Sequence, residues 1–200
     1  MITLPERLQP QTEIYRKMLE QFSTDLRVAS PGTIVSYDSN AQTATIQLTL
    51  REKINIDGSL SWEEIPLLVD VPVIMLRAGG YMLEFTPTTG DECLVIFGDN
   101  CMDAWWQSSG VQNQIDKRRH DLSDGFAILG PTSQPKKISS LGSGIRLRNE
   151  AGSVKIEISG TTATITASNV VLGTNTTIDG KVFLSHTHSD PQGGTTGGVT

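Results

Sequence analysis

The chain has 200 residues, a net charge of −6, three histidines and a hydrophobic fraction of 37%. This acidic balance argues against a function that depends on neutralising nucleic-acid phosphates across a basic face. No apolar run approaches the roughly 18 residues that a helix needs to cross a bilayer, and the N-terminus lacks the apolar core of a signal peptide. The sequence therefore predicts a protein that is made and folded in a cytoplasm.

Residues 1–29 predict one amphipathic helix that begins after Pro10. Apolar side chains recur at every third or fourth position, and charged and amide side chains fill the other face. The apolar positions are Ile14, Tyr15, Met18, Leu19, Phe22 and Leu26. Two interpretations stay open, because the apolar stripe could dock on a partner protein or cover the domain that follows.

Residues 30–135 predict a small β-barrel or sandwich made of short strands. The first part, 32–50, has the pattern of a strand, a polar turn and a second, alternating strand. Pro66 and Pro72 are expected to break the next apolar segment into short pieces at edges or bends. The continuously apolar segment 92–97 predicts a central strand, and GFAILGP predicts a final one.

Residues 136–184 change in character, because short alternating segments are separated by Gly, Asn or Ser. The expected strands are GIRLRN, GSVKIEIS, TATITAS, NVVLGT, TTIDG and KVFLS. Each offers few apolar side chains, so this segment cannot build a core alone. We expect copies of the chain to share one core about a threefold axis. A solenoid of one chain and a mobile Thr-rich stalk are the alternatives.

His186 and His188, in the tail 185–200, are the strongest candidates for binding chemistry. Residues two apart in an extended strand project from the same side, so both imidazoles lie together. Two ligands are too few for a site within one chain, whereas three chains would supply six imidazoles. Six ligands suit octahedral geometry and favour iron or a similar transition ion over tetrahedral zinc. A surface pair in a disordered tail is the alternative.

Catalytic motifs are absent from the sequence: it has no G-x-S-x-G, no phosphate-binding Gly loop before a helix and no H-E-x-x-H. We therefore expect no enzymatic turnover. His120 is expected to be a solvated loop histidine. The alternative is that His120 pairs with Asp121 and acts as a base. The adjacent carboxylates Asp91 and Glu92 are expected to serve solubility, because neighbours in a strand point to opposite faces.

Two further pairs carry open alternatives. Trp105 and Trp106 could form a platform for carbohydrate or for a partner, although one core tryptophan beside one edge tryptophan is the simpler interpretation. Cys93 and Cys101 form no CxxC pair, so two free thiols in a reducing compartment are expected. Whether they ever form a disulfide stays open.

The barrel segments GTIVSYDSNAQTATIQ, DVPVIM and TPTTGDECLVIFGDNCMDAWW, the segment RRHDLSDGFAILGP, and the Thr-rich repeat that leads into SHTHSDPQGGTTGG form a recognisable set. Together they resemble the central spike proteins of contractile phage tails, the membrane-puncturing needles at the tip of the baseplate. The resemblance extends from about residue 15 to the end of the chain.

The resemblance implies an all-β fold that follows an N-terminal helix. It implies an oligonucleotide/oligosaccharide-binding (OB) barrel over 30–135, an intertwined trimeric β-helix shaft over 136–184 and an apex at 185–200. It also implies that His186 and His188 of three chains bind one iron ion at the tip. Related tips hold further small ions, which cannot be assigned to residues here.

The implied function is to pierce the host cell envelope during sheath contraction, without catalysis. The implied partners are two further copies of the chain, a baseplate hub or tail-tube protein at residues 1–29, and the host outer membrane, with no nucleic acid. The expected location is the baseplate tip of the virion after assembly in the host cytoplasm. The alternatives are the spike of a tailocin or secretion machine, a sugar- or partner-binding OB module, and a metal-dependent enzyme that uses the histidine pair.

Overall fold

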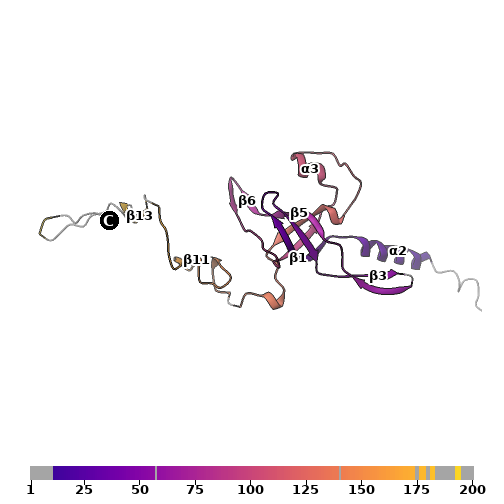
Figure 1. Cartoon of the computed structure of the whole chain (residues 1–200), viewed down its shortest axis with the longest axis horizontal. Helices are drawn as coiled ribbons and strands as arrows, with labels where there is room; N and C mark the ends of the chain where they lie inside the picture. Colours follow the sequence, from indigo (N-terminus) through magenta and orange to yellow (C-terminus); the bar gives the residue numbers. More distant parts are fainter. Residues whose placement is uncertain are drawn as a thin grey trace, which may run out of the picture. The chain divides into compact units, whose positions relative to one another are not determined.

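The computed structural model describes residues 11–56, 58–139, 141–173, 176–178, 181–182 and 192–194. The chain divides into two compact units, Met1–Lys137 and Ile138–Thr200, and each is described by itself (Figure 1). No helix in these described ranges is both long and apolar enough to span a membrane.

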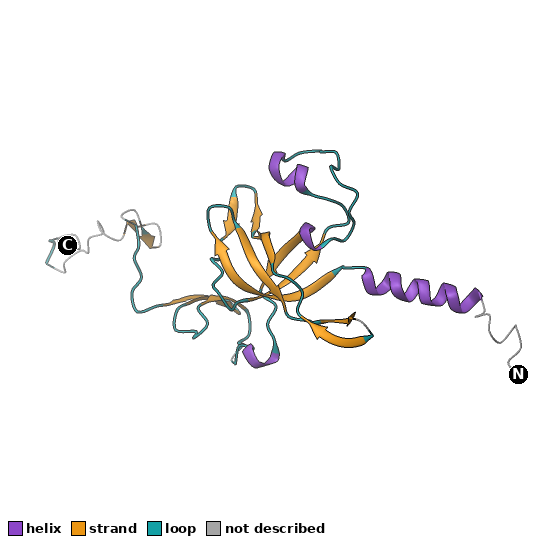
Figure 2. Ribbon diagram, turned by 45° about the vertical axis from the view of Figure 1, so that its right-hand side comes forward, coloured by secondary structure: helices purple, strands orange, loops and turns teal. Residues whose placement is uncertain are grey.

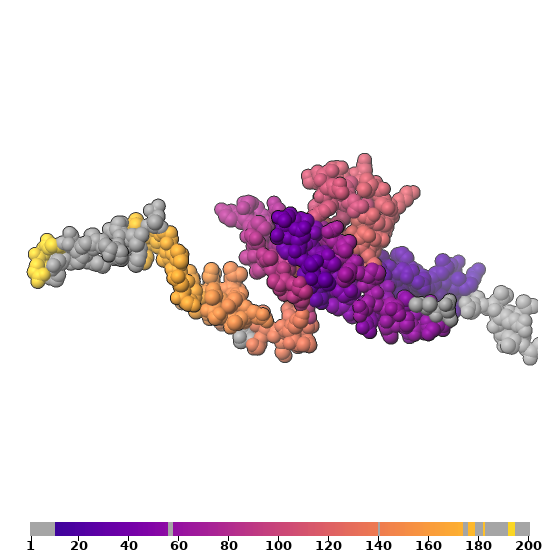
Figure 3. Space-filling model, in the orientation of Figure 1, coloured from indigo at the N-terminus to yellow at the C-terminus, as the bar shows by residue number. Residues whose placement is uncertain are grey.

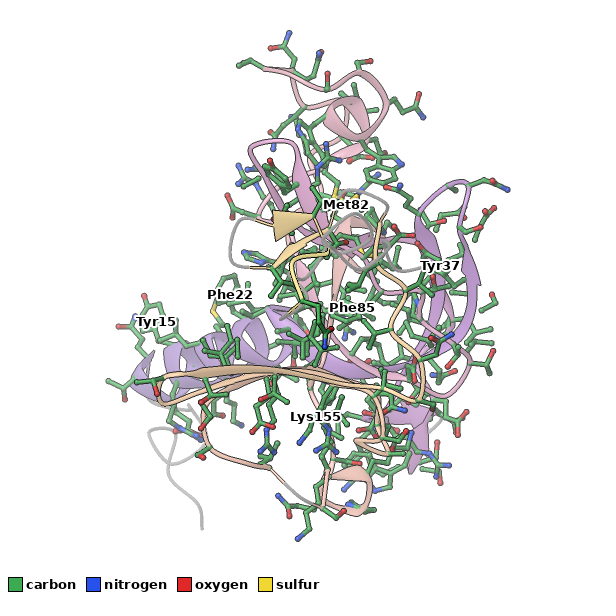
Figure 4. All side chains as sticks on the ribbon, turned by 90° about the vertical axis from the view of Figure 1, so that its left-hand side faces the viewer. Tyr15, Phe22, Tyr37, Met82, Phe85 and Lys155 are labelled. Carbon is green, nitrogen blue, oxygen red and sulfur yellow. The ribbon has the colours of Figure 1, made fainter. Side chains whose placement is uncertain are left out.

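The expected N-terminal helix is present as α2, Gln11–Asp25. Arg16 forms ion pairs with Glu13 and Glu20, one turn away on either side, which supports the helix at its surface. No residue of α2 is buried. The apolar stripe, on which Figure 4 labels Tyr15 and Phe22, is exposed along its length, and Phe22 is 64% exposed. Within one chain, therefore, the stripe does not serve as a cover for the barrel.

Five strands close the barrel of the first unit in the order β1-β2-β5-β9-β8 (Figure 2). The strands are β1, Ala29–Asp38; β2, Thr43–Leu48; β5, Leu68–Ile74; β8, Glu92–Phe97; and β9, Gly125–Leu129. All neighbours pair antiparallel except β5 and β9, which pair parallel. The predicted all-β class is confirmed, and this closed five-stranded arrangement is consistent with an OB-like barrel.

The barrel core comes from the alternation that the sequence shows. In β8 the buried positions are Cys93, Val95 and Phe97, while the residues between them are only partly buried. Gly32 lies on β1, where an added Cβ would come within 2.6 Å of the Ile46 side chain, so the strands approach closely there. The core residues are Ile34, Ala44, Ile46, Leu48, Ile65, Leu68, Val71, Val73, Cys93, Val95, Phe97 and Ala127.

Pro72 does not break its strand, contrary to the expectation from sequence. β5 continues through Pro72, where its pairing passes from β2 to β9: Pro72 is the register partner of Thr43, and Val73 is that of Ala127. This change of partner accommodates a residue that has no N–H to donate.

Asp70, two residues earlier, has a φ of 55°, a left-handed conformation that is uncommon outside glycine.

Smaller elements decorate the barrel (Figure 2). One hairpin joins β3 to β4, and another joins β6 to β7 through Gly79 and Gly80, both with positive φ. The elements are β3, Glu52–Ile56; β4, Ser59–Glu63; β6, Leu76–Ala78; β7, Tyr81–Leu83; α3, Asp103–Ser108; and the 3-10 turns η1, Leu122–Asp124, and η2, Gln134–Lys136.

The second unit contains an antiparallel three-stranded sheet in the order β10-β11-β12 and a short pair, β13-β14. Their bounds are β10, Ile145–Arg148; β11, Lys155–Ser159; β12, Thr162–Thr166; β13, Thr177–Ile178; and β14, Lys181–Val182. The strand expected at NVVLGT was wrong for its described part, 169–173, which forms no strand in this single chain. Its apolar side chains are exposed there, without a neighbouring strand to pack on.

A buried ion-pair network fixes the loop that carries α3. Asp124 is fully buried, and its carboxylate accepts hydrogen bonds from Arg118 Nε at 2.7 Å and from the Met102 backbone N–H at 2.9 Å. Arg118 also donates to Asp103 at 2.7 Å. The hydrogen bonds that Arg118 donates to Asp124 and to Asp103 hold the pKa of Arg118 above its ordinary value. One guanidinium thus ties the start of α3 to the segment that precedes β9.

Replacing Arg118 with methionine should lower the free energy of unfolding by about 3–5 kcal/mol, because it leaves the Asp124 carboxylate buried without its cation. Arg119→Met is the matched control, since Arg119 pairs with Asp99 at the surface and should cost at most about 1 kcal/mol. Denaturant unfolding of the two variants measures this difference, and equal losses would show that Arg118 has no special role.

Candidate assembly interface

The strongest sequence candidates, His186 and His188, lie outside the described residues, so the structure gives them no geometry. The third histidine differs from expectation. His120 is only partly exposed, its Nε2 lies 3.4 Å from Asp99 Oδ1, and its Nδ1 is buried without a hydrogen-bond partner. The pairing of His120 with Asp121 is not seen, because the Asp121 carboxylate instead accepts the Ser123 N–H at the start of η1. His120 is therefore not the solvated loop residue that its charged surroundings suggested.

Glu92 also has a more specific role than solubility. Its carboxylate accepts hydrogen bonds from the Ser133 N–H at 2.6 Å and from the Ser133 hydroxyl at 2.8 Å. These bonds lower the pKa of Glu92. They tie the segment that follows β9 back to the start of β8. Asp91 instead accepts the Thr88 N–H at 2.7 Å within its own turn.

Both tryptophans of the WW pair are exposed, so the expectation of one core tryptophan was wrong. Trp105 is 45% exposed and Trp106 is 42% exposed. Trp105 packs edge-on against Phe126 of β9, with ring centroids 5.9 Å apart. Trp106 lies on the same short helix, α3, and lines a cleft together with residues of β2, β5 and η1.

Cys101, Asp103 and Asp124 bring their ligand atoms within 4.8 Å of one another, which is close enough for a metal ion. Both carboxylates are, however, already bound by the guanidinium of Arg118. A bound cation would have to displace that positive charge from a buried position. The group is therefore a structural ion-pair network rather than a metal site.

The sheet β10–β12 presents one apolar and one polar face, because side chains alternate along each strand. The register places Ile145 opposite Ile158, and Leu147 opposite Ile156. It continues the apolar row into β12 by placing Ile156 opposite Ile165. The members of this apolar face are Ile145, Leu147, Ile156, Ile158, Ala163 and Ile165.

Burial in this sheet is the reverse of what a folded core requires. Along β11 the polar residues Lys155, Glu157 and Ser159 are partly buried, whereas Ile156 and Ile158 are exposed. The same reversal holds along β10. No described residue of the second unit is buried. In the part of the chain that the structure describes, the apolar face of β10–β12 is therefore uncovered.

The polar face, by contrast, is satisfied within the chain. Glu157 accepts a hydrogen bond from Arg146 Nε at 2.7 Å and pairs with Lys155 Nζ at 2.8 Å. The hydrogen bonds from Lys155 and then Arg146 lower the pKa of Glu157. Figure 4 labels Lys155 of this face. The polar groups of this face are thus paired within the chain, whereas the apolar side chains of the other face are exposed.

Glu157→Gln should lower the thermal stability of the protein at pH 7, because it removes the charge that holds Arg146 and Lys155. A carboxylate with a lowered pKa contributes stability above its unfolded pKa, near 4.5, and loses it as the pH falls through its folded value. The difference in melting temperature between wild type and variant should therefore shrink in acid. Thermal scans from pH 7 to pH 3 test this, with the exposed Glu150→Gln as the control that leaves the profile unchanged.

Sequence reasoning missed two features of the described chain. The first is the ion pairing of Arg118 with Asp103 and Asp124, since Arg118 lies in the charged segment KRRHDL. The second is the left-handed backbone of Asp70, which lies inside a strand. The repeated charges of KRRHDLSDG could have indicated internal pairing, since Arg118 and Asp124 are six residues apart in a segment that must turn. Nothing in the local sequence marks the conformation of Asp70.

The barrel segment of the sequence matches a known protein family. The sequence model of a family described as phage protein Gp138 N-terminal domain matches residues 30–130, just over half of the chain. The matched segment begins in β1 and ends just after β9, so it spans all five barrel strands. A comparison with curated proteins found no match.

Proposed function

The chain belongs to the phage protein Gp138 N-terminal domain family, and from this premise we propose that it is the homotrimeric central spike of a contractile tail baseplate. Family membership supports a structural role in a phage virion. The finer role, to pierce the host envelope when the sheath contracts, is the function that the uncovered sheet supports best. The spike of a related tailocin or secretion machine would use the same features.

The observation that carries the proposal is the exposed apolar face of β10–β12 beside a satisfied polar face. A three-stranded sheet without a packed face is marginal in water. Three copies, each turning its apolar face to a common axis, would enclose a shared core that no single copy builds. Strands paired between chains would also remove free sheet edges along such a shaft. Under this proposal residues 136–184 form the intertwined trimeric β-helix.

Polar substitutions on the apolar face should abolish this assembly. The double variant Ile156→Asn and Ile158→Asn places amides where a shared core would need apolar groups, so its mass should fall from three chains to one. Thr164→Asn is the matched control, because Thr164 lies on the polar face, opposite Glu157 in the register. Sedimentation velocity reports the mass of each protein. A monomeric wild-type protein would contradict the proposal.

The second part of the proposal concerns the apex, residues 185–200, where His186 and His188 of three chains would bind one iron ion. The support is the sequence alone: two imidazoles on one side of an extended segment, multiplied by three. Imidazole is a ligand suited to iron and to related transition ions. An ion shared by three C-terminal segments would join them at the point where chain ends otherwise fray. Any further small ions at the tip stay unassigned.

Purified protein without a histidine tag should carry close to one iron per three chains. His186→Ala combined with His188→Ala should remove that metal, whereas His120→Ala should retain it, because His120 lies in the barrel unit beside Asp99. Elemental analysis by plasma mass spectrometry makes the measurement. Metal content that is unchanged in the double variant would place the ion elsewhere. A different metal at the same ratio would correct its identity only.

The exposed stripe of α2 is the proposed attachment point for a baseplate hub or tail-tube protein. Its apolar side chains are arranged along one face of a helix that the barrel leaves free, which suits insertion into a groove of a partner. The host outer membrane is the proposed target of the apex, residues 185–200. The proposal includes neither catalysis nor nucleic-acid binding, since the work of penetration would come from sheath contraction.

A further inference from the structure

A cleft of about 590 Å³ lies between the α3 segment and the barrel. In Figure 3 the segment around α3 projects from the barrel near the β1–β2 end. The volume falls within the roughly 300–1,000 Å³ of pockets that bind small molecules. The lining residues that matter here are Thr43, Asp70, Asp103, Trp106, Gln107 and Ser123.

Trp106 supplies a flat apolar surface in this cleft. Its neighbour Trp105 is held against Phe126, with ring centroids 5.9 Å apart, and the two indoles lie 6.3 Å apart. The Arg118–Asp103 ion pair fixes the first turn of α3. Trp106 is therefore presented by an anchored helix while its own side chain stays 42% exposed. A rigid, exposed indole is suited to stacking against the C–H face of a ring.

Short polar side chains converge on the same cleft from separate elements. Thr43 begins β2, Asp70 lies in β5, Gln107 in α3 and Ser123 in η1. Carboxylate, amide and hydroxyl groups can together accept and donate hydrogen bonds to neighbouring hydroxyls of one ligand. Asp70 holds a left-handed backbone, with φ 55°, and such conformations cluster at ligand sites.

The charge of the lining selects among ligands. Two carboxylates, Asp70 and Asp103, line the cleft, and none of its described lining residues is a lysine or an arginine. The nearby Arg118 is already shared between Asp103 and Asp124. Phosphates and sialic acids would be repelled, whereas an uncharged, hydroxyl-rich ring would meet both an apolar plane and hydrogen-bonding groups.

We infer that this cleft binds a neutral oligosaccharide, with one ring stacked on Trp106 and its hydroxyls bonded to Asp70 and Gln107. The position agrees with this ligand class. The cleft lies over β2 and β5, between the β1–β2 loop and the β8–β9 connection, and the corresponding face and loops of OB barrels bind oligosaccharides. A contact with glycan at the barrel goes beyond piercing, and it does not require the trimer or the iron.

Isothermal titration of the full chain with maltotriose and with triacetylchitotriose tests the inference, one probe for neutral hexoses and one for N-acetylhexosamines. At least one should bind saturably, and 3′-sialyllactose should bind more weakly. Trp106→Ala should weaken binding by about tenfold or more, as loss of a stacking contact of about 1.4 kcal/mol implies. Trp62→Ala is the matched control, because Trp62 is exposed on β4 and outside the cleft.

Asp70→Asn and Gln107→Ala provide independent variants in case loss of the indole disturbs α3, and each should weaken binding several-fold while circular dichroism stays unchanged. Three results overturn the inference: neither neutral probe binds, binding is equal in wild type and in all three cleft variants, or sialyllactose binds best. The spike proposal would survive each of them. Conversely, a monomeric protein that binds maltotriose would contradict the spike proposal while supporting the cleft.

Discussion

Apolar side chains on the described part of the second unit are exposed, and this exposed apolar surface is the constraint on which the proposed assembly depends. The barrel unit solves the problem internally, because five strands close around residues such as Ile46 and Val95, which are fully buried. The sheet β10–β12 has one apolar face, and no described residue of the second unit is buried against it. The first unit therefore has a closed core of its own, whereas the described residues of the second unit form no buried core.

Prediction from sequence succeeded where a pattern depends only on neighbouring residues. Alternation located the barrel strands and the apolar face of β11, and the spacing of Ile14 to Phe22 located α2, because these periods follow from backbone geometry. It failed where a distant residue decides the outcome. Pro72 stays in its strand because the pairing changes from β2 to β9 there, a relation that no local window contains.

The same limit explains the errors at side chains. The charged neighbours of His120 in sequence predict a solvated side chain, but its backbone N–H donates to the Gly98 carbonyl and its Nδ1 is buried. Arg118 lies in the same charged segment, but its guanidinium donates hydrogen bonds to Asp124 and Asp103. The apex histidines differ in kind, because His186 and His188 lie outside the described residues. Only the residue types and their spacing were predictable there, and they stay a prediction.

The two cysteines of the barrel show what its closure does not depend on. Cys93 and Cys101 are both free and buried, and burial raises the pKa of the Cys93 thiol to about 11. Since the thiolate is the species that reacts with oxidants and disulfides, a buried protonated thiol is chemically inert at neutral pH. Strand β8 pairs with β1 and β9 around Cys93, and neither thiol is engaged in a disulfide. Closure of the barrel therefore depends on strand pairing and on the packing of its apolar core rather than on oxidation of its two thiols.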